Sequence, residues 1–505
     1  MARWRALVGV SCALAALIAI GSGPARALTD EDIFRNLRWN LTSPGARTLA
    51  VGGAFTGIAD EVTAIEANPA GLWSLGAPEL FAEFRVIDGD RTVFASSMGS
   101  LEVTPVTGER DLPFLELSSV SEPETASDAA FIGVAWPFSL GSKERRLTIA
   151  GSRSLVLSDE RSLGPEEAGT GARFAFDSFP NTVNGDQVEA YSVTTMVTGD
   201  IDMSIVSWNF GAAYELTPDF AIGATATYMT LDVEASTTTQ IVDPLELFVD
   251  PSHPRLPPNP AVDVYGTRID DSDAKLTYVL GVHWHPATSF ATGLSPWSFG
   301  AVFRKGAEFR VQETTMLNET EDEIFDNVIV VPDRYAVGVS YRMPRQWLFA
   351  FELERIQFSD IFEEFKAGVN YLTSGRLADG AFGTDPNVPI RYSLDDATVP
   401  RVGAEFRPGL GGSVEIAVQA GWYRMADSRP EMTSFNSTDP EVNAAYLEAF
   451  RGGDPVDHAT VGVTVRYGSS RFQAAGDFSN VENRFAASYV FAWAGRGVQV
   501  RGGKP

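Results

Sequence analysis

The sequence predicts an all-β protein: a transmembrane barrel of about fourteen antiparallel strands, with an N-terminal segment folded inside its lumen. Three observations support this prediction. Apolar and polar residues alternate in many short segments, short and long connections alternate between these segments, and no apolar run after the N-terminus reaches the ~18 residues that a spanning helix needs. The 505 residues include 46 Gly, 32 Phe, 13 Tyr and 10 Trp, which suits strands and turns.

The charge balance excludes one large class of function. Lys and Arg total 39 against 66 Asp and Glu, so the formal net charge is −27. A nucleic-acid-binding protein needs a basic surface, and none is expected here.

The first 27 residues have the features of a secretory signal peptide. Arg3 and Arg5 form a positive start, residues 6–20 are apolar, and Ala25-Arg26-Ala27 is a small-x-small cleavage site. Cys12, the only cysteine, lies inside the apolar run. The mature chain is therefore expected to be exported and to contain no disulfide, no thiol nucleophile and no thiolate metal site.

Strict period-two alternation identifies the strands. In the segment 206–214, Trp208, Phe210 and Tyr214 occupy even positions, while small or polar residues occupy most odd ones. The same pattern recurs along the mature chain and predicts fourteen strands near 79–97, 128–138, 145–157, 201–214, 219–232, 274–285, 296–311, 333–342, 346–359, 398–407, 412–424, 457–467, 471–479 and 484–494.

The connections distinguish a membrane barrel from a soluble β-protein. Short turns alternate with long polar segments near 158–200, 233–273, 312–332, 360–397 and 425–456, as in outer-membrane barrels. A β-propeller or large sandwich would explain the alternation but not this asymmetry. Nor would it explain aromatics near strand ends, which suit the two interfacial girdles: Trp208, Tyr214, Trp284, Trp297, Trp422, Tyr467 and Trp493.

Residues 28–78 do not alternate and are rich in Gly and Ala. Small residues permit close backbone packing, which a segment folded inside a lumen requires. We call this segment the hatch, residues 79–494 the barrel, and residues 495–505 a periplasmic tail.

The hatch resembles the N-terminal plug of FadL/TodX-type outer-membrane transporters and of the related PorV-type barrels. The matching residues are Gly45, Arg47, Gly52, Gly53, Phe55, Asp60, Asn68, Pro69, Ala70, Gly71 and Leu72, and strands near 297–304, 332–341 and 347–351 also resemble the family. The Gly-Ala-Arg … Gly-Gly-Ala-Phe spelling is nearer to PorV-type members.

This resemblance implies a plugged fourteen-stranded barrel in the outer membrane of a Gram-negative bacterium. It also implies passive uptake of hydrophobic molecules such as long-chain fatty acids or aromatic hydrocarbons. The PorV-type likeness implies instead a role in protein secretion or surface attachment, and a structural membrane protein is a third alternative. Expected partners are outer-membrane lipid and lipopolysaccharide, a hydrophobic ligand, and the barrel-assembly machinery, which would read the C-terminal aromatic pattern ending at Trp493.

No catalytic motif is present, so the protein is not expected to be an enzyme, and no cofactor is predicted. His283 and His285 share one face of a strand and could hold a metal ion with a third ligand, or simply face the lumen as polar residues. Acidic clusters at 270–273 and 319–323 could bridge divalent cations to lipopolysaccharide or form solvated charge runs. No metal site is therefore predicted.

Two of the long loops contain amphipathic helical patterns. Phe362 and Phe365 share one helical face, and Val442, Tyr446 and Phe450 share another after an Asp-Pro helix start at 439–440. These helices would form a greasy groove that captures a ligand, or would cap the barrel.

Charged residues inside the predicted lumen suggest two further hypotheses. Parity places four arginines on the lumen side, where one could hold a carboxylate headgroup or all could pair with acids such as Glu352 and Glu405: Arg304, Arg334, Arg401 and Arg466. In the hatch, Arg47 should pair with a carboxylate and Asp60 with a wall arginine. Such pairs would make the hatch a gate, or would belong to a rigid plug beside a lateral opening.

Overall fold

The computed structural model describes most of the barrel and of the hatch. The described residues are 41–97, 116–140, 145–163, 172–176, 181–183, 186–188, 193–242, 264–286, 296–317, 320–343, 346–361, 391–408, 413–426, 428, 431–434, 444, 447 and 451–493. The predicted signal peptide, residues 28–40 and the predicted C-terminal tail lie outside this set.

Long strands dominate the fold, and three short helical segments precede them. The helical segments are α3 (Ala46–Ala50), α4 (Ala64–Ala67) and the 3₁₀ helix η2 (Pro69–Ser74). The strands are β1 (Glu79–Ser97), β2 (Glu116–Leu140), β3 (Arg145–Leu163), β4 (Ala172–Phe176), β5 (Asn181–Val183), β6 (Asp186–Val188), β7 (Val193–Thr217), β8 (Phe220–Val242), β9 (Val264–Trp284), β10 (Trp297–Arg304), β11 (Ala307–Leu317), β12 (Thr320–Val331), β13 (Arg334–Arg342), β14 (Trp347–Ile356), β15 (Arg391–Ser393), β16 (Ala397–Phe406), β17 (Val414–Met425), β18 (Glu431–Ser434), β19 (Val456–Tyr467), β20 (Ser470–Phe478) and β21 (Glu482–Ala492).

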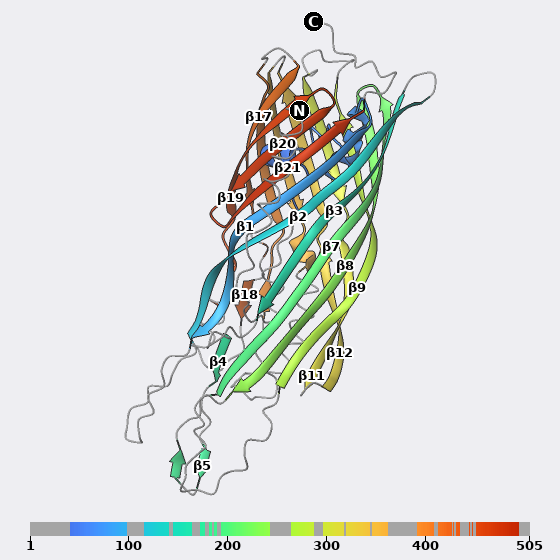
Figure 1. Ribbon diagram of the computed structural model, residues 1–505. Coiled ribbons are helices and arrows are strands. Elements are labelled where there is room, and N and C mark those ends of the chain that lie inside the picture. Colours follow the sequence, from blue (N-terminus) through green and yellow to red (C-terminus); the bar gives the residue numbers. More distant parts are fainter. Residues whose placement is uncertain are drawn as a thin grey trace, which may run out of the picture.

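Fourteen of these strands form a closed antiparallel barrel, which confirms the predicted fold class. The circuit runs β1-β2-β3-β7-β8-β9-β10-β13-β14-β16-β17-β19-β20-β21 and closes where Glu79 of β1 pairs with Ala492 of β21. Closure leaves no unpaired edge in the bilayer, where water cannot satisfy backbone groups. At the upper end in Figure 1, short turns join neighbouring strands, such as the one between Thr217 of β7 and Phe220 of β8.

The strands extend further from the membrane than the sequence predicts. Segments 158–200, 233–273 and 312–332 were expected to be long polar connections, but β3, β7, β8, β9, β11 and β12 continue into them (Figure 1). The physical reason is that alternation persists there: Ile201 and Met203 on β7 are buried, while Asp202 between them is exposed. The outward charges made these segments appear to be loops.

The outer surface of the barrel carries an apolar belt. Phe210 is 68% exposed and Leu276 is 75% exposed, and both point away from the lumen beside buried polar neighbours such as Asn209 and Thr277. Aromatics lie on the same surface, with Trp284 stacked on Phe299. This inverted arrangement requires lipid around the barrel and places the protein in the outer membrane of a Gram-negative bacterium.

No helix of the described residues is both long and apolar enough to span a membrane.

Candidate functional site

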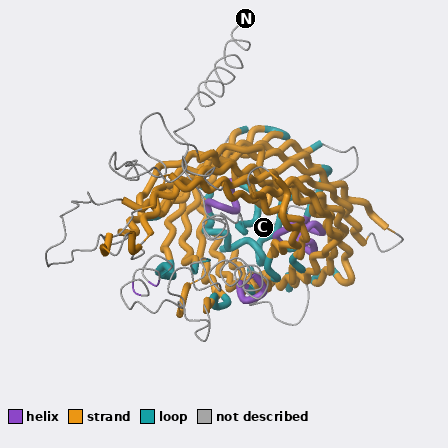
Figure 2. The backbone as a smooth tube through the Cα atoms, turned by 90° about the horizontal axis from the view of Figure 1, so that it is seen from below, coloured by secondary structure: helices purple, strands orange, loops and turns teal. Residues whose placement is uncertain are grey.

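Residues 41–76 lie inside the ring of strands, where Figure 2 shows short helices and loops enclosed by the wall. Their apolar side chains are almost fully buried, with Phe55 1% exposed and Leu49, Ile65 and Leu72 each 0% exposed. Three short helical segments and intervening turns build this plug, and η2 leads into β1.

Glycines let the hatch backbone touch the wall backbone. Gly52 has φ +66°, a left-handed conformation, and a Cβ there would lie 2.8 Å from the backbone N and O of Trp422. Across the contact, a Cβ on Gly421 would lie 2.3 Å from the N of Gly52. On β8, a Cβ on Gly223 would lie 2.2 Å from the N of Ala70. A larger residue at any of these positions would push the hatch away from the wall.

The Asn68-Pro69 pair starts η2 and ties it to β9. The Asn68 side-chain oxygen accepts a hydrogen bond from Ala70 N at 3.2 Å, and Pro69 occupies the first helical position. The Asn68 amide donates to Thr56 O and to Val282 O, each at 3.0 Å. One buried amide thus caps a helix and joins two parts of the hatch to the wall.

Arg47 is the centre of a buried ionic network at the base of the hatch. Its Nη1 lies 2.5 Å from Asp60 and 3.2 Å from Glu61, and its Nε lies 2.6 Å from Glu405 of β16. Asp60 in turn lies 3.4 Å from Arg342 of β13. The network therefore connects the hatch to two wall strands.

The network holds Arg47 and Asp60 ionised. Burial alone would lower the pKa of Arg47, but the carboxylates of Asp60, Glu405 and Glu61 outweigh it and raise that pKa well above its ordinary value. Burial alone would raise the pKa of Asp60, but Arg47 and Arg342 hold it well below its usual range. Losing Arg47 would leave each of these carboxylates with one cation fewer, since Arg342, Arg471 and Arg407 also pair with them.

A second buried network between the hatch and the wall is centred on Glu354 of β14. Arg401 Nη2 approaches Glu354 at 2.7 Å, and Arg304 and Arg334 approach it at 3.3 and 3.7 Å. Arg304 also donates to the carbonyl oxygens of Glu66 and Ala67 at 2.9 and 2.6 Å, so this network too holds the hatch.

Three of the four predicted lumen arginines are therefore already engaged with acids and with the hatch. Arg466 differs, because it lies at the periplasmic mouth, is 53% exposed and reaches Glu415 only at 3.8 Å. Among the acids named from the sequence, Glu405 binds Arg47, while Glu352 accepts the backbone N–H groups of Phe55 and Thr56 at 3.0 and 2.7 Å.

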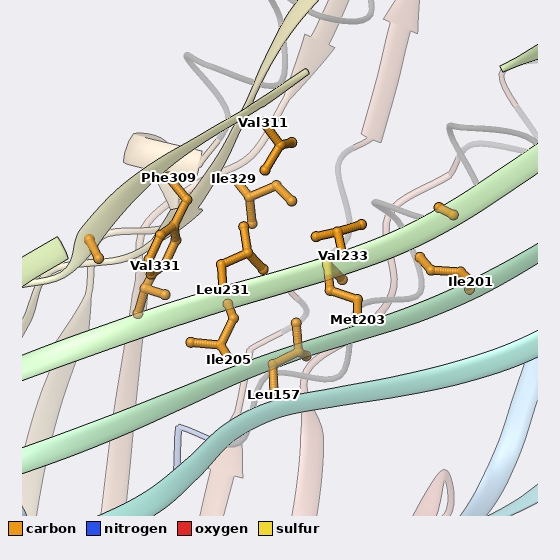
Figure 3. Packing of buried hydrophobic residues seen from close by; sticks show 12 residues of the cluster. Leu157, Ile201, Met203, Ile205, Leu231, Val233, Phe309, Val311, Ile329 and Val331 are labelled. Carbon is orange, nitrogen blue, oxygen red and sulfur yellow. The ribbon is translucent and has the colours of Figure 1, made fainter. Parts of the chain in front are cut away.

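Beyond the hatch, toward the long strand ends, the lumen is apolar. Buried side chains of the β3–β7–β8 wall meet those of the β11–β12 hairpin, as Figure 3 shows; we call this set the lumen cluster: Leu157, Ile201, Met203, Ile205, Leu231, Val233, Ala235, Ala307, Phe309, Val311, Ile329 and Val331. Sequence reasoning did not identify it, although residues 201, 203 and 205 already alternate, because part of it falls in segments interpreted as loops.

A small cavity of about 50 Å³ separates the lumen cluster from the hatch. Arg304, Arg334 and Glu66 lie on its hatch side, and Met229 and Val331 lie on its apolar side. Burial, only partly offset by a hydrogen bond from Ser154 and by the two arginines, raises the pKa of Glu66. The cavity is polar at one end and apolar at the other.

The two histidines named from the sequence have different surroundings. His283 lies against the hatch, with Nε2 3.4 Å from Gly57 O and Nδ1 3.3 Å from Trp73 Nε1, whereas His285 contacts Trp297 O and Ser298 Oγ. The residues of the predicted loop helices lie outside the described residues: Phe362, Phe365, Val442, Tyr446 and Phe450.

The acidic cluster at 270–273 bridges two strands. β9 pairs first with β10, up to the residue pair Val279–Arg304, and then with β11, starting from the pair Ile269–Glu313. Between these two pairs the described ladder is interrupted. In this interval, Asp273 and Asp271 accept the backbone N–H groups of Arg310 and Gln312 at 2.8 and 2.9 Å. We call this interval the seam.

Of the comparisons with known proteins, the one with solved structures finds a similar fold. No protein-family model matches the chain, and no curated protein matches it in sequence. Among solved structures, a Pseudomonas aeruginosa FadL homologue matches with TM-score 0.52 and 10% identity, covering 88% of this chain and 98% of that one. The CymD monoaromatic hydrocarbon channel (TM-score 0.48, 12% identity, 90% and 99% covered) and the Pseudomonas putida toluene transporter TodX (0.48, 10%, 90% and 99%) are also similar.

None of these three structures is named as a PorV-type barrel. The match to the FadL homologue, together with the closed circuit of fourteen strands, shows that this chain has the FadL-type outer-membrane barrel fold.

Proposed function

We propose that the protein is an outer-membrane channel for passive uptake of hydrophobic small molecules, such as long-chain fatty acids or aromatic hydrocarbons. The observation that carries this proposal is the lumen cluster. Barrels that pass water-soluble molecules have polar interiors. Here, Leu231, Phe309 and their neighbours form an apolar cluster in the part of the lumen beyond the hatch. An apolar interior favours an apolar permeant, because such a molecule loses unfavourable contact with water when it enters.

The cavity between the lumen cluster and the hatch favours an amphiphile within this class. A carboxylate could approach Arg304 and Arg334, which already carry the charge that such a group needs, while its apolar chain contacts Met229 and Val331. At about 50 Å³, the cavity requires side chains of the lumen cluster or the hatch to move before a long chain fits.

The seam offers a route from the membrane to the lumen cluster. Phe309 and Val311, which face the lumen cluster, lie on β11 beside the interrupted ladder. The carboxylates of Asp273 and Asp271 hold this part of the wall together with one backbone hydrogen bond, from Lys305 N to Tyr278 O at 2.9 Å. A hydrophobic molecule from the outer leaflet would enter here at the outer rim of the barrel, since Asp270 pairs with Glu234.

Uptake measurements test the proposal directly. In a strain that lacks the gene, the intact protein should restore uptake of labelled fatty acid or labelled toluene. Leu231→Asp with Ile205→Asp places two charges in the lumen cluster and should reduce uptake at least tenfold. Asp202→Asn, on the outward face of β7, the strand that carries Ile205, is the matched control and should leave uptake unchanged. If the double aspartate variant reaches the membrane in the same amount as the wild type and restores uptake at the wild-type rate, the proposal is contradicted.

The secretion and structural alternatives require different results. A secretion role predicts that deleting the gene leaves uptake unchanged and removes proteins from the cell surface, which an inventory of surface proteins would reveal. A structural role predicts neither change.

A further inference from the structure

The periplasmic mouth of the barrel contains a separate pocket of about 560 Å³. Its floor is the hatch, including Ile58, Asp60 and the stretch from Trp73 to Gly76, and its walls are strand ends near the short turns. The hatch and its ionic networks separate this pocket, which we call the vestibule, from the lumen cluster.

Four arginines from four different strands line the vestibule, against two carboxylates, those of Asp60 and Glu79. The arginines are Arg146 of β3, Arg342 of β13, Arg466 of β19 and Arg471 of β20. In a chain with a formal net charge of −27, a pocket with this excess of cations is unexpected.

Two of the four arginines have structural partners. Arg342 lies 3.4 Å from Asp60, and Arg471 lies 3.0 Å from Glu79 and 3.2 Å from Glu61. These contacts hold the hatch to the wall and account for both side chains.

The other two arginines are not accounted for in this way. Among the described residues, the guanidinium of Arg146 contacts the carbonyl oxygen of Trp73 at 3.4 Å, while the nearby Glu215 is engaged by the Arg146 backbone N–H instead. Arg466 approaches Glu415 only at 3.8 Å, with the two side chains 53% and 72% exposed, and so exposed a pair contributes little. Toward the described residues, these two guanidinium groups thus use only a small part of their hydrogen-bonding capacity.

The remaining lining suits the body of an organic ligand. Trp73, Ile58 and Pro296 offer apolar surface, and the Nδ1 atom of His285 contacts Trp297 O and Ser298 Oγ, so that its Nε2 is the ring nitrogen left for a ligand. An aromatic and a cation side by side recognise a carboxylate attached to an apolar group.

We propose that the vestibule is a binding site for the carboxylate of a compact organic acid, with Arg146, which contacts Trp73, as the group that binds the anion and Arg466 as a second cation of the same pocket. The site is distinct from the lumen cluster and does not depend on the proposed uptake function. The apolar lining near Trp73 selects acids with an apolar body over small inorganic anions.

Binding of octanoate to the purified full-length protein in nanodiscs tests this site. Octanamide has the same apolar chain without the charge, and inorganic phosphate has charge without the chain. Calorimetric titration should show octanoate binding at least tenfold more tightly than octanamide and than phosphate, and its affinity should fall as salt rises from 50 to 500 mM, because salt screens exposed charge.

Variants assign the binding to the vestibule rather than to the lumen. Arg146→Gln with Arg466→Gln should weaken octanoate binding at least tenfold and leave octanamide unchanged. Both side chains lie outside the buried networks, so heat-modifiable migration should remain normal. Arg355→Gln, whose side chain is 49% exposed at the opposite end of β14, is the matched control and should bind like the wild type.

Equal binding of octanoate and octanamide, or octanoate binding retained by the double variant, would overturn the vestibule site. Uptake by the same double variant is measured separately. Lost octanoate binding with normal uptake supports the site and shows that it is not required for transport, whereas normal binding in a protein that fails the uptake test contradicts the proposed function alone.

Discussion

Arg47 of the hatch and Glu405 of β16 are 358 positions apart in the sequence, yet Arg47 Nε lies 2.6 Å from Glu405 Oε2. Both side chains are almost fully buried, at 3% and 1% exposure. This contact fastens the plug to the barrel wall. The same guanidinium also binds Asp60 and Glu61, so one residue is shared by three carboxylates.

The first prediction concerns this residue. Arg47→Ala removes one cation from the buried carboxylates of Glu61 and Glu405, which keep Arg471 and Arg407 as partners. The loss should therefore be smaller than the ~3–5 kcal/mol that a buried charge without any partner typically costs. The barrel ladder is untouched, so we expect the protein to assemble while the hatch loosens. Planar-bilayer recordings should show higher conductance, and cells should admit small polar antibiotics. Arg355→Ala, an exposed arginine on β14, should change neither.

Asp60→Ala should act in the same direction but more weakly, since Asp60 is 27% exposed and Arg47 keeps two other partners. If both variants assemble and leave permeability and uptake unchanged, the hatch charges do not form a gate. The hatch is then a rigid plug, and the seam is the better route.

The second prediction is a pH dependence of the closed hatch. The pKa of Asp60 is held well below its ordinary value of 3.8, so its ion pairs contribute stability that is present above that pH. This contribution is lost as the pH falls from about 3.8 toward the lower pKa of the folded state. Conductance should therefore be constant from pH 7 to 5 and rise only below pH 4. In Asp60→Asn this part of the rise should disappear, and a rise that begins at pH 6 would contradict the assignment.

The third prediction concerns the close contact between hatch and wall. Gly223→Ala places a methyl group 2.2 Å from the backbone N of Ala70, so the hatch must shift away from β8. We expect protease to cleave the hatch in this variant while the barrel remains heat-modifiable. Gly151→Ala on β3 is the control, because its nearest neighbouring atom lies at 3.7 Å. Equal protection of the hatch in both variants would show that the contact is dispensable.

The fourth prediction concerns the seam. Asp271→Ala with Asp273→Ala removes the acceptors for the Gln312 and Arg310 N–H groups. Hydrogen exchange at these two amides should accelerate, and uptake of a hydrophobic substrate should increase if the seam admits it. Asp270→Ala is the control, because Asp270 pairs with Arg268 on its own strand rather than across the seam. Faster exchange with unchanged uptake would exclude the seam as the limiting step.

Several features of the fold were predictable because they depend on local pattern. Period two forces alternate side chains to opposite faces, so Trp208 and Phe210 were assigned together before any pairing was known. The even number of strands and the short-turn end followed from connection lengths. The Gly-rich hatch followed from the need for small residues where two backbones touch, as at Gly52.

The extent of the strands was less predictable. Charged residues such as Asp202 and Glu234 point outward above the bilayer, where water solvates them, and they made the segments around them resemble loops. Only the inward partners, Met203 and Val233, show that these segments enclose an apolar space.

By itself, the sequence determined that this chain is a membrane barrel of about fourteen strands with a small-residue hatch, and which face each strand residue occupies. The tertiary structure alone decided which inward charges meet. Parity assigns Arg401 to the lumen, but its contact with Glu354 at 2.7 Å depends on the stagger between strands, which no local pattern encodes. It likewise decided that Asp273 holds the seam, because the hydrogen bond from Arg310 N bridges an interruption in the ladder between β9 and β11 that no local pattern predicts.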